Sequence, residues 1–135
     1  MKVVLDTNTI VSAIGWDGPP WNVLRSARDG RHELIISPAL LAELARVLGY
    51  RKLRALASRP RFPVVLEWLH RPEHLVYPVE SLNVITQDPP DNHVLEAAVA
   101  GRADVIVSGD YHLLALGSFR EIPIISASEF TARYP

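Results

Sequence analysis

Cysteine is absent from this sequence of 135 residues. Its absence excludes disulfide bonds, thiolate metal sites and a cysteine nucleophile, so any metal ion would need oxygen or imidazole ligands. Long apolar runs are missing too, and none approaches the roughly 20 residues that span a bilayer. The chain opens Met-Lys-Val-Val-Leu-Asp, so charge interrupts it before a signal-peptide core of about 7 to 15 apolar residues could form. We therefore expect a soluble, cytoplasmic protein that does not associate with a membrane.

A large net charge is also missing. The 14 basic and 15 acidic residues give a net charge of −1, which predicts no overall attraction to nucleic acid but leaves a local one open. Hydrophobic residues make up 48% of the chain and charged residues 21%, which is ordinary for a globular protein. No repeat, linker or low-complexity tract divides the chain, so we expect one domain over residues 1–135.

The near-neutral total conceals an uneven distribution of charge. Residues 25–71 carry ten basic and four acidic side chains, whereas residues 72–135 carry three basic and nine acidic ones. One explanation is a chance fluctuation among solvated faces. The alternative is a basic surface and an acidic site in one protein, and the charges alone do not decide between the two.

Short apolar runs alternate with helical patterns along the chain. The expected strands are 2–5, 32–36, 103–107 and 122–125. The expected helices are 21–29, 38–48, 92–100, 111–116, one led by Ser128, and two short helices within 51–71. Ser37 is the expected cap of the second helix and Gly49 its end, Gly101 is expected to end the 92–100 helix, residues 16–20 read as a loop, and residues 72–85 are ambiguous. This alternation predicts an α/β domain with a largely parallel sheet covered on both faces.

Acidic residues fall where such a sheet would bind a ligand. Asp6 and Asp110 follow two strands directly, and the carboxyl ends of parallel strands meet at one edge. Asp91 begins the helix that leads into the 103–107 strand, and Glu43 lies at the margin of the apolar face of its helix. Each has an ordinary alternative: Asp91 and Asp110 as helix caps, Glu43 as a solvated glutamate, and Asp6 as a structural aspartate.

Charge repulsion limits what four clustered acids could be. Two carboxylates about 5 Å apart repel by about 3 kcal/mol at an effective dielectric constant near 20. A cluster of four must therefore share protons or bind a cation, and all-oxygen ligands favour Mg²⁺ or Mn²⁺ over zinc. The histidines do not support a zinc site, because Pro72 separates His70 from His74 and breaks the helix that this spacing would need.

These residues occur in four segments that together resemble the PIN domain family, as found in the toxins of bacterial VapBC-type toxin–antitoxin pairs. The resemblance runs from Val-Leu-Asp-Thr-Asn at 4–8 to Ile-Ile-Ser-Ala-Ser-Glu-Phe at 124–130. Between them lie Ser37-Pro38 followed by Glu43, the segment Asp-Pro-Pro-Asp-Asn at 88–92, and the segment from Ala103 to Asp110. No single segment is specific, but their order and spacing are.

The resemblance implies a PIN-like three-layer α/β/α fold with a central sheet of about five parallel strands. It also implies a ribonuclease that uses one or two Mg²⁺ or Mn²⁺ ions. The catalytic and metal-binding acids it implies are Asp6, Glu43, Asp91 and Asp110. Supporting positions are Asn8, Ser108 and, as a possible further ligand, Asp88. Tyr111-His112 departs from the family, in which Lys or Arg followed by Asp is common at this point.

The resemblance further implies an RNA substrate, a small cognate antitoxin and a homodimer. The basic region after the Glu43 helix is the expected path of the RNA backbone, and its candidate contacts are Arg46, Arg51, Lys52 and Arg54. A non-catalytic PIN-like RNA-binding module stays open as the alternative, although all four acids are present. A phosphatase or receiver domain is less consistent, because neither Lys2 nor Lys52 has the position of the required strand-end lysine.

Overall fold

The computed structural model describes residues 1–135. Its helices and strands alternate in the N-terminal and C-terminal parts of the chain, as the sequence pattern predicts, whereas residues 38–101 contain only helical elements. In chain order they are β1 (Lys2–Leu5), α1 (Thr7–Gly15), α2 (Pro19–Arg28), β2 (Glu33–Ile35), α3 (Pro38–Leu48), η1 (Arg51–Ser58), α4 (Arg61–Leu69), η2 (Pro72–His74), η3 (Pro89–Asp91), α5 (Asn92–Gly101), β3 (Val105–Val107), α6 (Tyr111–Leu116), β4 (Ser118–Phe119), β5 (Ile122–Ile125) and α7 (Ala127–Arg133). The η elements are short 3₁₀ helices.

The five strands form one sheet in the order β2-β1-β3-β5-β4. Four of them are parallel, with Val3 beside Leu34 and Val105, and Val107 beside Ile125. The expected largely parallel sheet is confirmed, although the fifth strand, β4, pairs with β5 in the antiparallel direction. β4 has only two residues and reaches β5 through a tight turn, which antiparallel strands permit and parallel strands do not.

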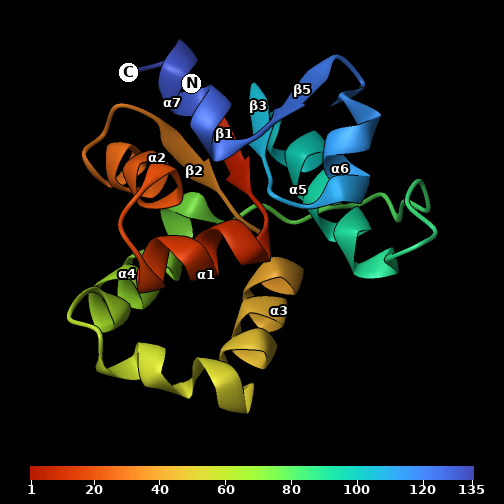
Figure 1. The fold of residues 1–135 in the computed structure, drawn as a ribbon. Coiled ribbons are helices and arrows are strands. Elements are labelled where there is room, and N and C mark those ends of the chain that lie inside the picture. The colour runs from red at the N-terminus through yellow and green to blue at the C-terminus, as the bar shows by residue number, and fades with distance from the viewer.

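Helices cover both faces of the sheet, which gives the expected three-layer α/β/α architecture (Figure 1). α5 packs against β1, β2 and β3, while α1 packs on α2, and α2 on α7. The central strand β1 is buried throughout Val3, Val4 and Leu5. A strand buried on both faces reads as a continuous apolar run, which is why Val-Val-Leu was recognisable. α3, η1 and α4 lie together in the lower part of Figure 1.

Local signals fix several helix ends. The Ser37 hydroxyl accepts a hydrogen bond from the Leu40 amide at 3.2 Å, Pro38 takes the first helical position, and Gly49 ends α3 as predicted. α6 also has the predicted bounds. The two short helices within 51–71 are confirmed as η1 and α4, although the first is a 3₁₀ helix and Pro63 lies inside the first turn of the second.

Other helix boundaries differ from the predictions. The sequence pattern gave no helix between the first strand and residue 16, but α1 follows Asp6 directly, and α2 begins inside the predicted loop, at Pro19. Gly101 belongs to α5 rather than ending it, and Arg102 ends the helix with φ at 52°. A side chain at 101 would lie 2.7 Å from Ile35, so packing requires glycine there. Ser126, not Ser128, caps α7.

Residues 72–85, for which the sequence pattern was ambiguous, contain little regular structure. After η2, Leu75 pairs with Ile36 at the edge of β2 through an isolated bridge. No helix or strand then occurs until η3 begins at Pro89. This segment, residues 76–88, is called the strap below. Its side chains are largely exposed, with Val79 98% exposed, but Ile85 is buried.

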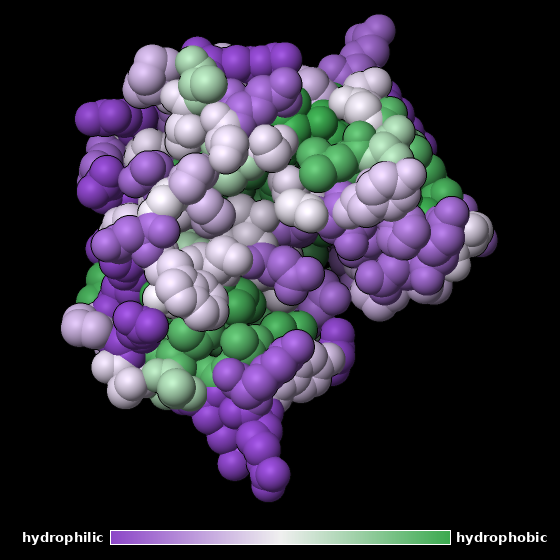
Figure 2. Space-filling model, viewed as in Figure 1, coloured by the Kyte–Doolittle hydropathy of each residue, from purple (hydrophilic) through white to green (hydrophobic).

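The surface is mixed in character, as Figure 2 shows. Apolar residues gather in patches on this face, bordered by hydrophilic ones, and strongly hydrophilic side chains project at the lower tip, where η1 lies in Figure 1. None of the helices combines the length and the apolar character needed to cross a membrane.

Candidate functional site

Asp6 lies at the carboxyl end of β1 and caps α1. Its Oδ1 accepts the Thr9 amide at 2.8 Å, and its Oδ2 accepts the Gly109 amide at 3.3 Å and the Ser108 hydroxyl. The residue is only 4% exposed. A buried carboxylate must be hydrogen-bonded or paired to be tolerated, and these three donors fulfil that need. Asp6 is therefore held in one fixed orientation at the edge of the sheet.

Ser108 connects Asp6 to Asp110. The hydroxyl of this fully buried serine donates to Asp6 Oδ2 and accepts the backbone amide of Asp110 at 2.9 Å. Ser108 directly follows β3, the strand beside β1. The Asp6 carboxylate and the Asp110 backbone, far apart in sequence, are therefore linked through one side chain.

Asp110 caps α6. Its Oδ1 accepts the amides of His112 at 2.8 Å and Leu113 at 3.1 Å. The helix-cap interpretation of Asp110 is thus confirmed, but it does not remove the residue from a site. Only one carboxylate oxygen makes these bonds, so Oδ2 is left for another interaction.

Asp88, Asp91 and Asp110 form a compact cluster, called the acidic triad below. Each offers a carboxylate oxygen, and these three oxygens all lie within 4.8 Å of one another. Asp88 is exposed, while Asp91 and Asp110 are half-buried. The helix-cap interpretation of Asp91 is wrong, because its side chain makes no capping bond to α5. Asp88, expected only as a further ligand beside Asp91, is thus one of the three clustered acids.

The acidic triad perturbs the titration of Asp91. Burial, and next the neighbouring Asp110 carboxyl, raise the pKa of Asp91 to about 8, with smaller contributions from the charges of Asp88 and Asp6. Burial and like charge both disfavour the ionised form of a carboxyl. The Oδ2 atom of Asp91 is buried and has no hydrogen-bond partner. Unpaired buried oxygens are rare in folded proteins, so this atom requires a partner, which either a proton shared with Asp110 or a cation would supply.

Glu43 reaches the site from α3 but is not a member of the acidic triad. Its Oε2 accepts the Thr7 hydroxyl at 3.0 Å, and its Oε1 lies 3.6 Å from Arg46. The side chain is 20% exposed, so it is not the freely solvated glutamate of the alternative interpretation. Thr7 follows Asp6 directly, and Glu43 is therefore attached to the same corner of the sheet as Asp6.

The other sequence-predicted residues have different surroundings. Asn8 is exposed in the first turn of α1. Arg46 is occupied by Glu43 and by a hydrogen bond to the Tyr50 hydroxyl. Arg51, Lys52 and Arg54 are exposed on η1 and make no ion pair. These three side chains are therefore available to an anionic partner.

Two residues that the sequence did not single out contact the site. Thr7 holds Glu43, and the buried Asn92, next to Asp91, bonds to the strap. Thr7 and Asn92 both adjoin predicted acids, which is the only signal the sequence carried for them. His93 bonds to Glu96 at 3.1 Å, and only the backbone amide of His112 bonds to Asp110. Neither contact gives a histidine ligand to the acidic triad.

The residues present fit a divalent cation. The donor set is entirely carboxylate oxygen, which suits hard cations such as Mg²⁺ and Mn²⁺. The unpartnered Oδ2 of Asp91 and the crowding of three acids are what a bound cation would relieve. Asp91, Asp110 and Asp88 are the residues placed to hold it, with Asp6 fixed nearby.

The three-layer α/β domain thus carries an acidic cluster at the carboxyl edge of its sheet. The sequence model of the PIN domain family matches residues 2–112, and the chain belongs to this family. Comparisons with curated proteins and with solved structures gave no match. This match confirms the expected PIN family, and the sheet and its covering helices confirm the expected fold. PIN domains are generally nucleases that act on nucleic acids.

Proposed function

We propose that this protein is a Mg²⁺- or Mn²⁺-dependent endoribonuclease and the toxin component of a toxin–antitoxin pair. The observation that carries the proposal is the unpartnered, buried Oδ2 of Asp91 within a set of three carboxylates whose oxygens lie within 4.8 Å. Such a cluster is stable only when it shares protons or neutralises its charge with a cation. Of these two possibilities, a bound cation is the one that fits the nuclease family to which the chain belongs.

The acids have different roles in this proposal. Asp91, Asp110 and Asp88 hold one or two cations, and Asp6 completes the site from the end of β1. Glu43 contacts the Asp6 corner of the site indirectly, through its hydrogen bond with Thr7. A divalent cation supplies the positive charge that activates water and offsets the charge building on the phosphate and the leaving 3′-oxygen. No side-chain nucleophile is required, so the products carry 5′-phosphate and 3′-hydroxyl ends.

The chain's own residues also support an RNA substrate path. Arg51, Lys52 and Arg54 project from η1, which follows the Glu43-bearing helix α3. Contacts between such cations and phosphates dominate the affinity of most nucleic-acid-binding proteins. In this proposal the three side chains contact the phosphates of the RNA backbone. Arg46 contacts them only after its ion pair with Glu43 and its hydrogen bond with Tyr50 break.

The proposal includes two protein partners: a small cognate antitoxin and a second copy of this chain. The exposed apolar side chains on the strap and on α6 support contact with protein. Tyr77 is 69% exposed, Val79 98% and Tyr111 77%. Large apolar side chains exposed to this degree are candidate contacts with a protein partner. Co-purification from a host that expresses the neighbouring upstream reading frame tests the antitoxin assignment, and light scattering tests the dimer.

One experiment tests the nuclease assignment directly. Purified protein is incubated with labelled total RNA, with Mg²⁺ or with EDTA, and the new 5′ ends are sequenced. We expect cleavage at discrete positions only with the metal. Cleavage that survives both EDTA and an Asp6→Asn substitution excludes the metal mechanism. Salt-dependent RNA binding with no cleavage under any metal condition identifies the non-catalytic module instead.

A further inference from the structure

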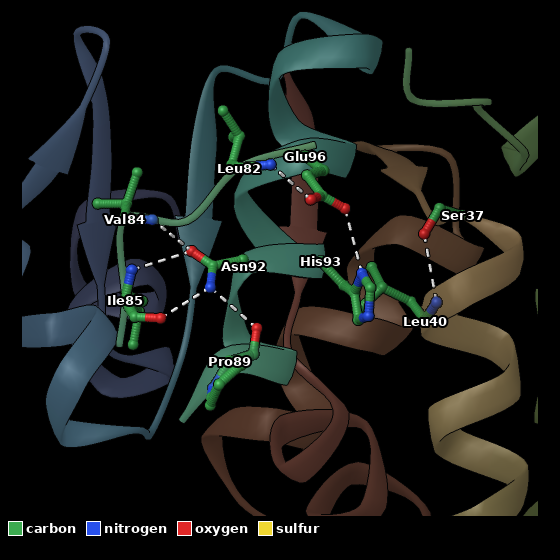
Figure 3. Close-up of polar contacts among 9 residues, drawn as sticks. All are labelled: Ser37, Leu40, Leu82, Val84, Ile85, Pro89, Asn92, His93 and Glu96. Carbon is green, nitrogen blue, oxygen red and sulfur yellow. Dashed lines mark hydrogen bonds and ion pairs between the residues drawn. The ribbon is translucent and has the colours of Figure 1, made fainter. Parts of the chain in front are cut away.

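Asn92, the first residue of α5, makes every hydrogen bond that its side-chain amide can make. Its Oδ1 accepts the amides of Val84 and Ile85, each at 2.9 Å. Its Nδ2 donates to the carbonyls of Ile85 at 2.8 Å and Pro89 at 2.9 Å. An amide group has two donors and two acceptor positions. The residue is 3% exposed, so no bond is left to water, and Figure 3 shows all four partners around it.

The three residues that make these four bonds belong to the segment that delivers Asp88. Val84 and Ile85 lie on the strap, and Pro89 directly follows Asp88. The Asp88 carbonyl in turn accepts the Asp91 amide at 3.0 Å, which closes the turn between these two acids. The strap has no helix or strand of its own. Asn92 therefore supplies side-chain bonds on both sides of Asp88, in sequence, while adjoining Asp91 itself.

A second anchor lies one turn further along the same helix. Glu96 Oε2 accepts the Leu82 amide at 2.8 Å, and its Oε1 bonds to His93. Residues four apart lie on one face of a helix, and Figure 3 shows Asn92 and Glu96 bonding to successive parts of the strap. Only Asn92 reaches the Pro89 side of Asp88. Loss of Glu96 would therefore loosen the strap alone, whereas loss of Asn92 would also release the backbone next to Asp88.

We propose that Asn92 is a positioning residue that holds Asp88 and Asp91 in the geometry that binds a divalent cation. Carboxyls this close repel one another when they are ionised, as a cation site requires, so the geometry of the acidic triad depends on a fixed backbone around Asp88. The Asn92 amide opposes that opening from inside the core. This inference deepens the proposed function, because it assumes that the acidic triad is the cation site.

The test compares two alanine variants that detach the strap at different points. The affinity for Mn²⁺ is measured by electron paramagnetic resonance on the wild type, Asn92→Ala and Glu96→Ala, with circular dichroism to verify folding. We expect Asn92→Ala to weaken Mn²⁺ binding by at least about tenfold, as is typical when residues that orient metal ligands are lost. Glu96→Ala should change the affinity by less than about twofold.

Hydrogen exchange of the metal-free protein separates failure of this inference from failure of the proposed function. We expect Asn92→Ala to accelerate exchange of the Ile85 and Asp91 amides, and Glu96→Ala to accelerate that of Leu82. These changes are expected even if the wild type binds no Mn²⁺ and cleaves no RNA.

Three results would overturn the inference. Asn92→Ala could fold and bind Mn²⁺ like the wild type, or both variants could lose the metal equally, which would make the effect a general loosening of the strap. If Asn92→Ala does not fold, Asn92→Ser takes its place, since its hydroxyl retains part of the hydrogen bonding. Unfolding of both Asn92 variants would assign the residue a purely structural role.

Discussion

The Ser108 hydroxyl donates a hydrogen bond to Asp6 across 102 residues of sequence. The same oxygen accepts the Asp110 amide, so a single buried atom links the ends of two neighbouring strands. Asp6 and Asp110 consequently hold their relative positions without any cation present. A site prepared in this way loses less conformational entropy when the cation binds.

Replacing Ser108 by alanine should weaken both the fold and the site. Asp6 loses one of its three donors, and the Asp110 amide loses its acceptor, which predicts a loss of about 1–3 kcal/mol in the free energy of unfolding. Mn²⁺ affinity should fall by about tenfold, because Asp6 and Asp110 are no longer tied together. Urea denaturation and Mn²⁺ titration measure the two effects.

Ser126→Ala is the matched control for Ser108→Ala. Ser126 also follows a strand, β5, and its hydroxyl caps α7 through the Glu129 amide at 3.1 Å. Loss of this cap should cost about 1 kcal/mol without any change in Mn²⁺ affinity. Equal losses of affinity in the two variants would show that the site responds to stability alone and that the Ser108 bridge has no special role.

The raised pKa of Asp91 predicts how stability depends on pH. The ordinary pKa of 3.8 applies to the unfolded chain, whereas the folded protein has a pKa of about 8. Between these values the folded state binds more protons than the unfolded state, so this group's contribution to stability falls as pH rises through that window. In EDTA, the melting temperature should therefore fall between pH 5 and pH 8 by more in the wild type than in Asp91→Asn.

Divalent cations should reverse this dependence. A cation binds the ionised carboxyl and must displace its proton, so metal affinity increases with pH. Saturating Mg²⁺ should raise the melting temperature more at pH 8 than at pH 5, since a ligand that binds only the folded state stabilises it. If Mg²⁺ raised the melting temperature equally at both pH values, or equally in the wild type and in Asp91→Asn, the cation would bind away from Asp91.

Local signals predicted much of the fold. Ser37-Pro38 and Gly49 fixed α3, and the β-branched run at Val3 marked a buried strand. The sequence analysis predicts no helix at α1, because it assigns Asp6 to the end of the strand and not to a helix cap. Asp6 nevertheless caps α1, and the buried Ile10, Ala13 and Ile14 recur at helical spacing.

The site was predictable only in part, because its contacts join distant segments. Placement of acids after strands identified Asp6 and Asp110, since parallel topology sends these ends to one edge. Nothing local shows that Thr7 bonds to Glu43, 36 residues away. The closeness of Asp88 to Asp110 likewise depends on Asn92 fixing the strap, a tertiary effect without a sequence pattern of its own.

The basic side chains of η1 should control the salt dependence of RNA binding. Neutralising a phosphate contact on a single strand contributes a slope of about 0.7 in log affinity against log salt. Replacing Arg51, Lys52 and Arg54 with glutamine should therefore lower the slope by about 2, measured by fluorescence anisotropy with an unlabelled metal-free protein and a labelled RNA. Replacing Arg25, Arg28 and Arg31 makes the same charge change on another surface and should leave the slope unaltered. Matching slopes in both triple variants would support the chance-distribution explanation of the charges.

Asp6→Asn should reduce RNA cleavage to the level seen in EDTA while the protein stays folded. Asparagine caps helices about as well as aspartate, so α1 should persist, but the buried site loses a negative charge that a cation would use. Asp104→Asn is the matched control, because Asp104 precedes β3 at the opposite edge of the sheet and accepts the Lys2 amide at 2.7 Å. That variant should cleave RNA at the wild-type rate. Gel assays with Mg²⁺ and circular dichroism measure activity and folding; full activity of a folded Asp6→Asn protein would remove Asp6 from the catalytic site, leaving the acidic triad to act without it.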